Sequence, residues 1–117
     1  MRQVVKRTDF AENKPLTEPV FLILTSLAGE PRHGYALLQD IQNISSERVI
    51  LSTGTLYGAL RRLLEDGLIE RFEQPDKSRD KQAYRLTADG RRQLRLEVER
   101  MRQLTRTAAM RLKEGEV

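Results

Sequence analysis

The sequence predicts a mainly α-helical domain with a small β-hairpin and a long C-terminal helix. Apolar residues recur at helical spacing in four separate segments of the 117-residue chain. Between the third and fourth segments lie two short strand-like stretches, joined by a charged loop that opens with a proline. The fourth segment runs for more than twenty residues with a regular apolar stripe. The expected order is therefore helix, helix, short strand, helix, hairpin, long helix.

The composition is that of one globular domain. Hydrophobic residues make up 38% and charged residues 32% of the chain, a balance unlike that of disordered sequences. Without cysteine and with one histidine, neither a disulfide framework nor a metal site is expected, and no cofactor motif is present. The longest apolar run, residues 20–24, is too short to span a membrane, and no apolar segment follows the basic start as in a signal peptide. We therefore expect a cytoplasmic protein, and its net charge of +4 points toward polyanions.

The first two helices are bounded by recognisable start and stop residues. Residues 1–15 are expected to form an arm or a short frayed helix. The first firm helix begins at Thr17, a suitable N-cap, and ends at Gly29 and Pro31. A second helix is expected from about His33. Its apolar face would contain Leu37, Leu38, Ile41 and Ile44.

The third helix combines an ordinary buried face with a bare outer one. It is expected to begin after Ser52, a natural N-cap, and to end at Gly67, where glycine is favoured beyond a helix end. A β-branched piece, residues 49–51, precedes it and could be a minimal strand. The buried face would contain Leu56, Leu60, Leu63 and Leu64. The other side of its first two turns carries small residues and one large one, Tyr57.

Two short strands follow the third helix and would form a hairpin. Residues 68–74 make the first strand and residues 82–86 the second, with the charged loop 75–81 between them. Thr87 then caps the long last helix. This order is that of the winged helix-turn-helix, in which a three-helix core presents its third helix and a β-hairpin wing to DNA. Residues 16–87 would form the DNA-binding domain, followed by a helix over residues 88–117.

The bare start of the third helix suits a recognition helix. Such a helix enters the major groove by its N-terminal turns, where small residues let the backbone approach and free N–H groups can bond phosphate. Thr53, Tyr57 and Arg61 are four apart and share one face, from which they can reach bases or phosphates. The candidate DNA-contacting residues of this region are Ser52, Thr53, Gly54, Thr55, Tyr57, Gly58 and Arg61, with Tyr35 from the second helix.

Several of these residues also allow a structural interpretation. Gly58 could let another helix pack closely, and Tyr57 could cap the edge of the core. Tyr35 could bury its ring against the third helix rather than reach a phosphate. His33 could cap the second helix or lie on the side that faces phosphate. The sequence of this region leaves both interpretations open.

Three blocks together resemble the PadR family of transcriptional regulators. They are, in this order, LTEPVFLILTSLAGEPRHGYALLQDI, STGTLYGALRRLLEDGLIE and KQAYRLTADGRR. The resemblance extends over roughly residues 16 to 112. The chain length, with a single C-terminal helix, is similar to the short subgroup of that family. The resemblance implies a homodimeric DNA-binding repressor with a palindromic operator, not an enzyme. It also implies that a small aromatic or lipophilic effector can regulate binding.

The chain departs from the family pattern at two places. The family's third helix often has proline where this chain has Gly58. Its wing usually carries a glycine and several basic residues, whereas the wing loop here mixes two acids with three bases. The resemblance still implies a wing contact with phosphate or the minor groove. The residues that would make it are Lys77, Arg79 and Lys81.

The last helix carries a heptad seam that predicts a dimer. The spacing along this seam alternates between four and three residues, which is typical of helices that pair. The expected dimer interface contains Leu94, Val98, Met101, Leu104, Thr105, Ala108 and Leu112. The alternative is that the helix folds back on the first helix of its own chain. Val98, Met101 and Leu104 could also line an effector pocket, although methionine in a seam is more often plain packing.

Two functional hypotheses follow from the sequence. The first is a homodimeric, sequence-specific transcriptional regulator, a repressor that a small molecule releases. The second is a dimeric winged-helix protein-interaction module that has no specific operator, which the acid-diluted wing and Gly58 motivate. No catalytic constellation is present, so an enzyme is not expected.

Overall fold

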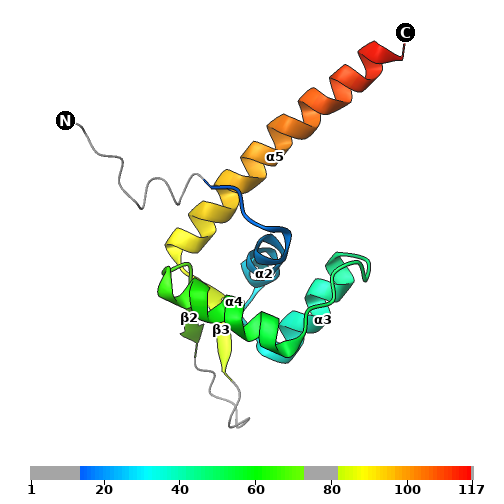
Figure 1. Cartoon of the computed structure of the whole chain (residues 1–117). Helices are drawn as coiled ribbons and strands as arrows, with labels where there is room; N and C mark the ends of the chain where they lie inside the picture. Colours follow the sequence, from blue (N-terminus) through cyan, green and yellow to red (C-terminus); the bar gives the residue numbers. More distant parts are fainter. Residues whose placement is uncertain (1–13, 73–81, 117) are drawn as a thin grey trace, which may run out of the picture.

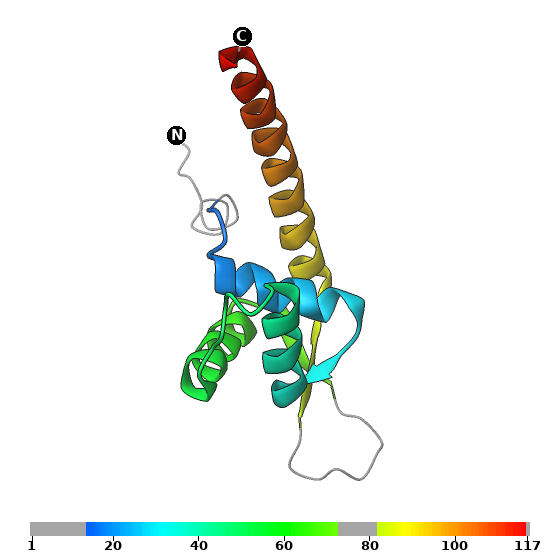
Figure 2. The same ribbon diagram turned by 90° about the vertical axis from the view of Figure 1, so that its right-hand side faces the viewer.

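The computed structural model describes residues 14–72 and 82–116. Three helices and a small sheet form the body, and a fourth helix projects from it (Figures 1 and 2). The elements are α2 (Glu18–Gly29), β1 (Arg32–His33), α3 (Gly34–Ile44), α4 (Thr53–Glu65), β2 (Ile69–Phe72), β3 (Ala83–Leu86) and α5 (Ala88–Gly115). The prediction of a mainly α fold with a small β-hairpin and a long last helix is confirmed.

Three hydroxyl caps set the helix starts that the sequence predicted. The Oγ1 of Thr17 accepts a hydrogen bond from the Val20 N–H at 3.3 Å, at the start of α2. Ser52 Oγ accepts from the Thr55 N–H at 3.1 Å, and Thr87 Oγ1 caps α5 in the same way. Each cap satisfies one of the N–H groups that a helix start leaves without an intrahelical partner. His33 occupies the N-cap position of α3, but its side chain makes no capping bond.

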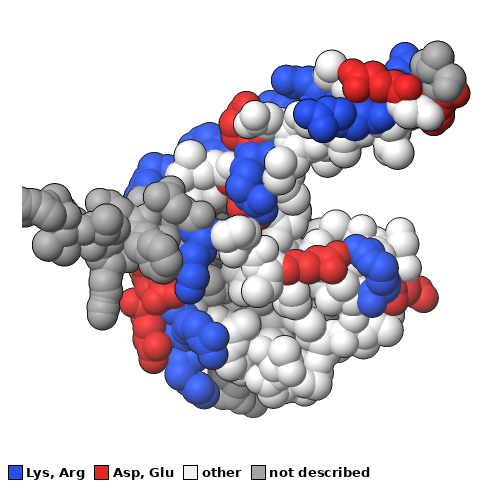
Figure 3. All heavy atoms as spheres, turned by 45° about the horizontal axis from the view of Figure 1, so that its top comes forward, with Lys and Arg blue, Asp and Glu red and all other residues white. Residues whose placement is uncertain are grey.

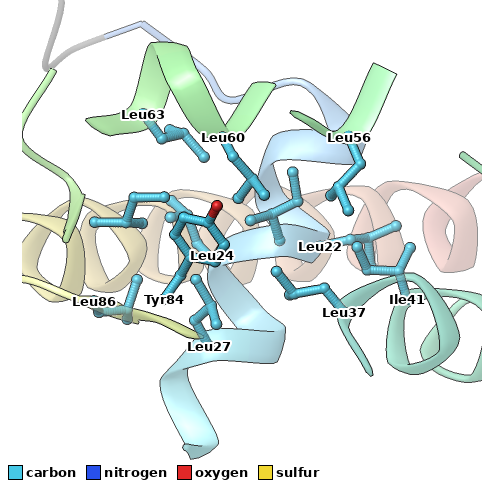
Figure 4. Packing of buried hydrophobic residues seen from close by; sticks show 12 residues of the cluster. Leu22, Leu24, Leu27, Leu37, Ile41, Leu56, Leu60, Leu63, Tyr84 and Leu86 are labelled. Atoms are coloured by element: carbon cyan, nitrogen blue, oxygen red, sulfur yellow. The ribbon is translucent and has the colours of Figure 1, made fainter. Parts of the chain in front are cut away.

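The core is built around α2. Leu22, Ile23, Leu24 and Leu27 are almost completely buried. Figure 4 shows side chains from α4, α3 and β3 converging on those of α2. Burying one such leucine contributes about 1.5–3 kcal/mol, so α2 is the largest single source of apolar stabilisation. The residues that meet α2 are Leu37, Ile41, Leu56, Leu60, Leu63, Tyr84 and Leu86.

The sheet has one strand more than the predicted hairpin. Its order is β1-β3-β2, and both pairs are antiparallel. The added strand, β1, contains two residues that pair with Tyr84 and Ala83. On the outer face Arg85 joins β3 to β2 by an ion pair with Glu70 at 2.7 Å. The predicted strand ends at 73 and 74 and the loop 75–81 lie outside the described residues.

Two local predictions around α3 were wrong. Residues 49–51 do not form a strand, and the strand that joins the hairpin is β1, which pairs with β3. The Val49 N–H instead bonds Ser45 Oγ at 3.0 Å, after a turn with positive φ at two residues. Ile50 is 68% exposed, and Ile44, expected on the buried face of α3, is 43% exposed. Neither side chain packs against the hydrophobic core around α2.

A close junction joins the end of α4 to the start of α5. After α4, Gly67 has a φ of 76°, which turns the chain into β2. Its carbonyl accepts a bond from Thr87 Oγ1 at 2.6 Å, and the Leu68 carbonyl accepts from the Thr87 N–H at 3.1 Å. A Cβ on Gly90 would lie 1.9 Å from the Leu68 oxygen. The first turn of α5 therefore rests directly on the backbone of this turn.

Only the first half of α5 packs on the body. Gly90, Gln93 and Glu97 are its buried residues, and every residue from 102 to 116 is exposed. Glu97 accepts hydrogen bonds from Arg100, one of them from Nε at 3.2 Å. These bonds lower the pKa of Glu97, and the Leu16 backbone N–H lowers it further, against the opposing effect of burial. Glu97 thus ties the segment before α2 to α5.

We predict that Gly90→Ala is strongly destabilising. The added methyl group would overlap the Leu68 carbonyl, which is backbone and cannot move aside, so a loss of about 2–4 kcal/mol is expected. Urea unfolding measures it. The control Gly115→Ala, in the same helix but with open space around its Cβ, should change stability by less than about 0.5 kcal/mol. Equal effects of the two substitutions would contradict the close contact.

We also predict that Glu97 contributes to acid unfolding. Its folded-state pKa is lowered, so its stabilisation is present above the unfolded pKa of about 4.3 and is lost as pH falls through the folded value. Thermal unfolding midpoints, measured from neutral pH downward through that range, should fall less steeply for Glu97→Gln than for the parent chain. Arg100→Gln should flatten the same part of the curve. An unchanged slope in both variants would show that this ion pair does not couple to folding.

Candidate nucleic-acid interface

The helix α4 presents a polar, small-residue surface at its start. Leu56, Leu60 and Leu63 face the core, whereas Thr53, Gly54 and Thr55 are exposed. Arg61 is exposed two turns further along. This division follows from the helical spacing of the leucines, which brings every residue of the outer face to the surface.

The backbone at the start of α4 is available for an anion. Ser52 Oγ accepts the Thr55 N–H and donates to Thr55 Oγ1 at 2.9 Å. Neither the Thr53 N–H nor the Gly54 N–H bonds another residue in the described part of the chain. Both belong to the first turn, where the positive end of the helix dipole favours negative charge. A phosphate oxygen is a suitable partner for them.

Tyr57 lies across Gly34, at the first residue of α3. A Cβ on Gly34 would stand 2.2 Å from the Tyr57 hydroxyl oxygen and 2.8 Å from the ring carbon that carries it. The ring therefore occupies the space that a side chain at Gly34 would fill. Tyr57 is nevertheless 43% exposed. Tyr57 therefore packs against α3 and also remains partly exposed, so the two interpretations of this residue are compatible.

A second tyrosine lies near the Tyr57 hydroxyl. Burial raises the pKa of the Tyr84 phenol, and the nearby Tyr57 adds to the rise, while Arg71 acts in the opposite direction. Tyr84 comes from β3, so the charge of the Tyr57 phenolate acts on a residue of the sheet, while the Tyr57 ring packs against α3. Sequence reasoning missed Gly34 as the residue that makes this possible. In the sequence, the only mark of this residue is that it is a glycine next to His33.

The start of α3 adds polar groups to this surface. Tyr35 is 69% exposed, so its ring is not buried against α4. The Gln39 amide Nε2 donates a hydrogen bond to the Tyr35 hydroxyl at 3.2 Å. Gln39 was not among the predicted residues. The four-residue spacing from Tyr35 on one helix face could have identified it.

Of the predicted wing, the structure describes the base of the hairpin. Lys77, Arg79 and Lys81 lie outside the described residues. At the base of the hairpin, Arg71 is exposed and its Nε donates to Gln82 Oε1 at 2.7 Å. Arg71 was also missed, although its place in a short strand could have marked it as a cation near the wing.

Gly58 does not serve helix packing within the described chain. A Cβ built on it meets nothing within 4 Å. Glycine in a helix interior costs about 1 kcal/mol relative to alanine, so packing offers no reason for this choice. Gly58 and Gly54 instead border a groove of about 960 Å³ that also touches the segment before α2 and the first turns of α5.

The predicted interface residues of α5 lie on its projecting part, except at its start. Leu94 packs against the core of its own chain, and Met101 is half-buried. Val98, Leu104 and Leu112 are 37%, 54% and 68% exposed. Thr105 and Ala108 are exposed between them. Figure 3 shows α5 standing away from the body, with largely uncharged surface on both sides of the space between them.

Two classes of site have no support in the described residues. Within residues 14–72 and 82–116, no three histidine or acidic side chains gather closely enough to hold a metal ion. None of the described helices combines the length and the apolar character that a membrane span requires.

The three-helix body, the sheet behind α4 and the exposed start of α4 define a winged-helix, DNA-binding class of protein. The transcriptional regulator PadR-like family matches residues 23–96. The chain belongs to this family, whose members are transcriptional regulators rather than enzymes.

Individual relatives agree with this assignment. A PadR family transcriptional regulator from Eggerthella lenta is 32% identical, with a TM-score of 0.61 over 82% of this chain and 81% of its own. A PadR-like transcriptional regulator from Bacillus cereus is 24% identical, with a TM-score of 0.68 over 80% of this chain and 90% of its own. In sequence, 84 residues are 38% identical to an uncharacterized 37.1 kDa protein in transposon TN4556 of Streptomyces fradiae. That match covers 72% of this chain and only 23% of the relative.

We predict that Gly34 and Tyr57 are energetically coupled. Gly34→Ala should destabilise the chain by about 1–2 kcal/mol, because the new methyl group displaces the Tyr57 ring. In a Tyr57→Ala background the same change should be neutral or stabilise α3 by up to about 1 kcal/mol. A double-mutant cycle by thermal unfolding measures this difference. The same effect of Gly34→Ala in both backgrounds would contradict the contact.

Proposed function

We propose that the protein is a homodimeric transcriptional repressor in which α4 of each chain reads one half of a palindromic operator. The observation that carries this proposal is the exposed polar start of α4, with Tyr57 held beside it. A recognition helix must offer its first turns without bulky side chains that keep the backbone from the groove. The small residues and unpaired N–H groups of α4 meet that requirement.

In this proposal each candidate residue has a defined contact. Thr53, Tyr57 and Arg61 face base edges, where a hydroxyl or guanidinium can bond and the tyrosine ring can meet a thymine methyl group. Tyr35, on α3, reaches the backbone. The residues that let α4 approach and bind phosphate are Ser52, Gly54, Thr55 and Gly58. Those that extend the contact through the wing are Lys77, Arg79 and Lys81.

The distal half of α5 supports the homodimer. Leu104 and Leu112 are each more than half exposed, on a helix with no further body to pack against in the described chain. A second copy of the same surface would bury them around a twofold axis. Residues 16–87 would then bind DNA and residues 88–117 dimerise. Residues 1–15, mostly outside the described part, would be an arm or a short helix.

The proposal includes release by a small aromatic or lipophilic effector. Within a dimer, Val98, Met101 and Leu104 from two chains would surround an apolar space, and methionine adapts to ligands of different shapes. Plain packing of these residues is the alternative. A ligand that binds one arrangement of the two chains better than another would shift the spacing of the two α4 helices.

The test is selection of bound DNA from a random library, followed by titration of the selected sequence at several salt concentrations. The expected site is twofold symmetric, with half-sites about one helical turn apart. Tyr57→Ala should weaken binding to this site by about 100-fold and leave circular dichroism unchanged. Only weak, salt-sensitive binding without an enriched sequence would favour the interaction module without an operator.

The wing contact has its own matched pair of variants. Arg79→Ala should weaken binding to all sequences alike and lower the salt slope by about one. Arg106→Ala removes the same charge from the exposed distal half of α5 and should change neither quantity. Equal salt slopes for Arg79→Ala and the parent chain would remove the wing from the interface.

A further inference from the structure

Arg71 projects from the face of the sheet that packs against α4. Ile69, two residues earlier on β2, belongs to the core cluster, and so does Tyr84, which pairs with Arg71 across the sheet. This cluster also contains Leu60 and Leu63 of α4. Alternate residues of a strand, and residues paired directly across a sheet, share one face. Arg71 therefore lies on the α4 face, but it is exposed because the core ends before it.

The sheet register places Arg71 at the same end of the sheet as the exposed start of α4. His33 of β1 and Phe72 of β2 pair with the same residue of β3, in the row next to Arg71. His33 is followed by Gly34, where the Tyr57 ring packs. Neighbouring strands lie about 4.8 Å apart, so β2 is about 10 Å from β1. Arg71 is thus set to one side of the groove-facing residues of α4.

The charge of Arg71 has no acidic partner in the described chain. Its Nε donates to Gln82 Oε1 at 2.7 Å, and neither of its terminal nitrogens bonds another described residue. The Gln82 bond orients the guanidinium and leaves both terminal nitrogens available. Such a pair binds two oxygens of one phosphate. Arg85, by contrast, forms an ion pair with Glu70 on the other face of the sheet.

We propose that Arg71 binds a DNA backbone phosphate between the groove that α4 reads and the groove that the wing approaches, and that Gln82 positions it. This inference rests on the proposed function. The major groove of B-DNA is about 12 Å wide, so a cation offset by about 10 Å from the α4 contacts reaches the phosphates at its border. A contact to the backbone strengthens binding to every sequence alike.

The test compares Arg71→Ala with Arg85→Ala, which removes the same charge from the other face of the sheet. Binding is titrated at several salt concentrations, with the duplex selected from a random library and with a scrambled duplex of equal length. For each bound chain, Arg71→Ala should weaken binding to both duplexes about tenfold and lower the salt slope by about one. Arg85→Ala should match the parent chain in both quantities. Thermal unfolding of the two variants checks that each remains folded.

A double-mutant cycle tests Gln82 as a positioning residue. Gln82→Ala keeps the charge of Arg71, so the salt slope should stay at the parent value while binding weakens about threefold. In an Arg71→Ala background the same change should have no further effect. An equal effect of Gln82→Ala in both backgrounds would show that Gln82 does not act through Arg71.

Two results would overturn the assignment of Arg71. One is a salt slope for Arg71→Ala equal to that of the parent chain on both duplexes. The other is an equal loss in Arg71→Ala and Arg85→Ala, because net charge rather than a contact would then explain it. Failure of the proposed function gives a different result: no duplex is enriched, yet Arg71→Ala still lowers the salt slope on random DNA. A parent chain that binds neither duplex would overturn both.

Discussion

The contact between Gly90 and the carbonyl of Leu68 is the constraint on which the arrangement of this molecule depends. It brings the first turn of α5 onto the turn that ends α4, where Thr87 bonds both Gly67 and Leu68. Strand β2 leaves this point and strand β3 returns to it, so α4, the two strands and α5 share one junction (Figure 2). The direction of α5 relative to α4 is thereby fixed by backbone atoms. In the proposed dimer, this angle would set the distance between the two reading helices.

Tyr57 shows how one residue can serve both the fold and the surface. Its ring uses the space left by Gly34, yet nearly half of the residue remains exposed. A residue held in this way loses little conformational freedom when it meets a partner. The packing of α3 against α4 therefore prepares the surface that the proposed function uses.

The local parts of the fold could be predicted, and the parts that depend on distant contacts could not. The N-cap residues Thr17, Ser52 and Thr87 predict the starts of their helices, because a cap acts within one turn of the chain. The two-residue strand β1 has no pattern of its own and exists because β3 offers it an edge. Residues 49–51 have the composition of a strand but pair with none of the described strands. For the candidate site, the helical spacing of α4 predicted which residues are exposed, whereas Gly34 opposite Tyr57 is a contact through space that no local pattern encodes.

We propose that a second copy covers the projecting half of α5 and so brings two α4 helices together as a symmetric pair. Sedimentation equilibrium of the intact chain measures this most directly. We expect a mass twice that of the 13.5 kDa chain at micromolar concentration. We also expect a folded monomer when Leu104 and Leu112 are both replaced by aspartate. A monomeric mass for the intact chain across the same concentrations would show that α5 does not pair two chains.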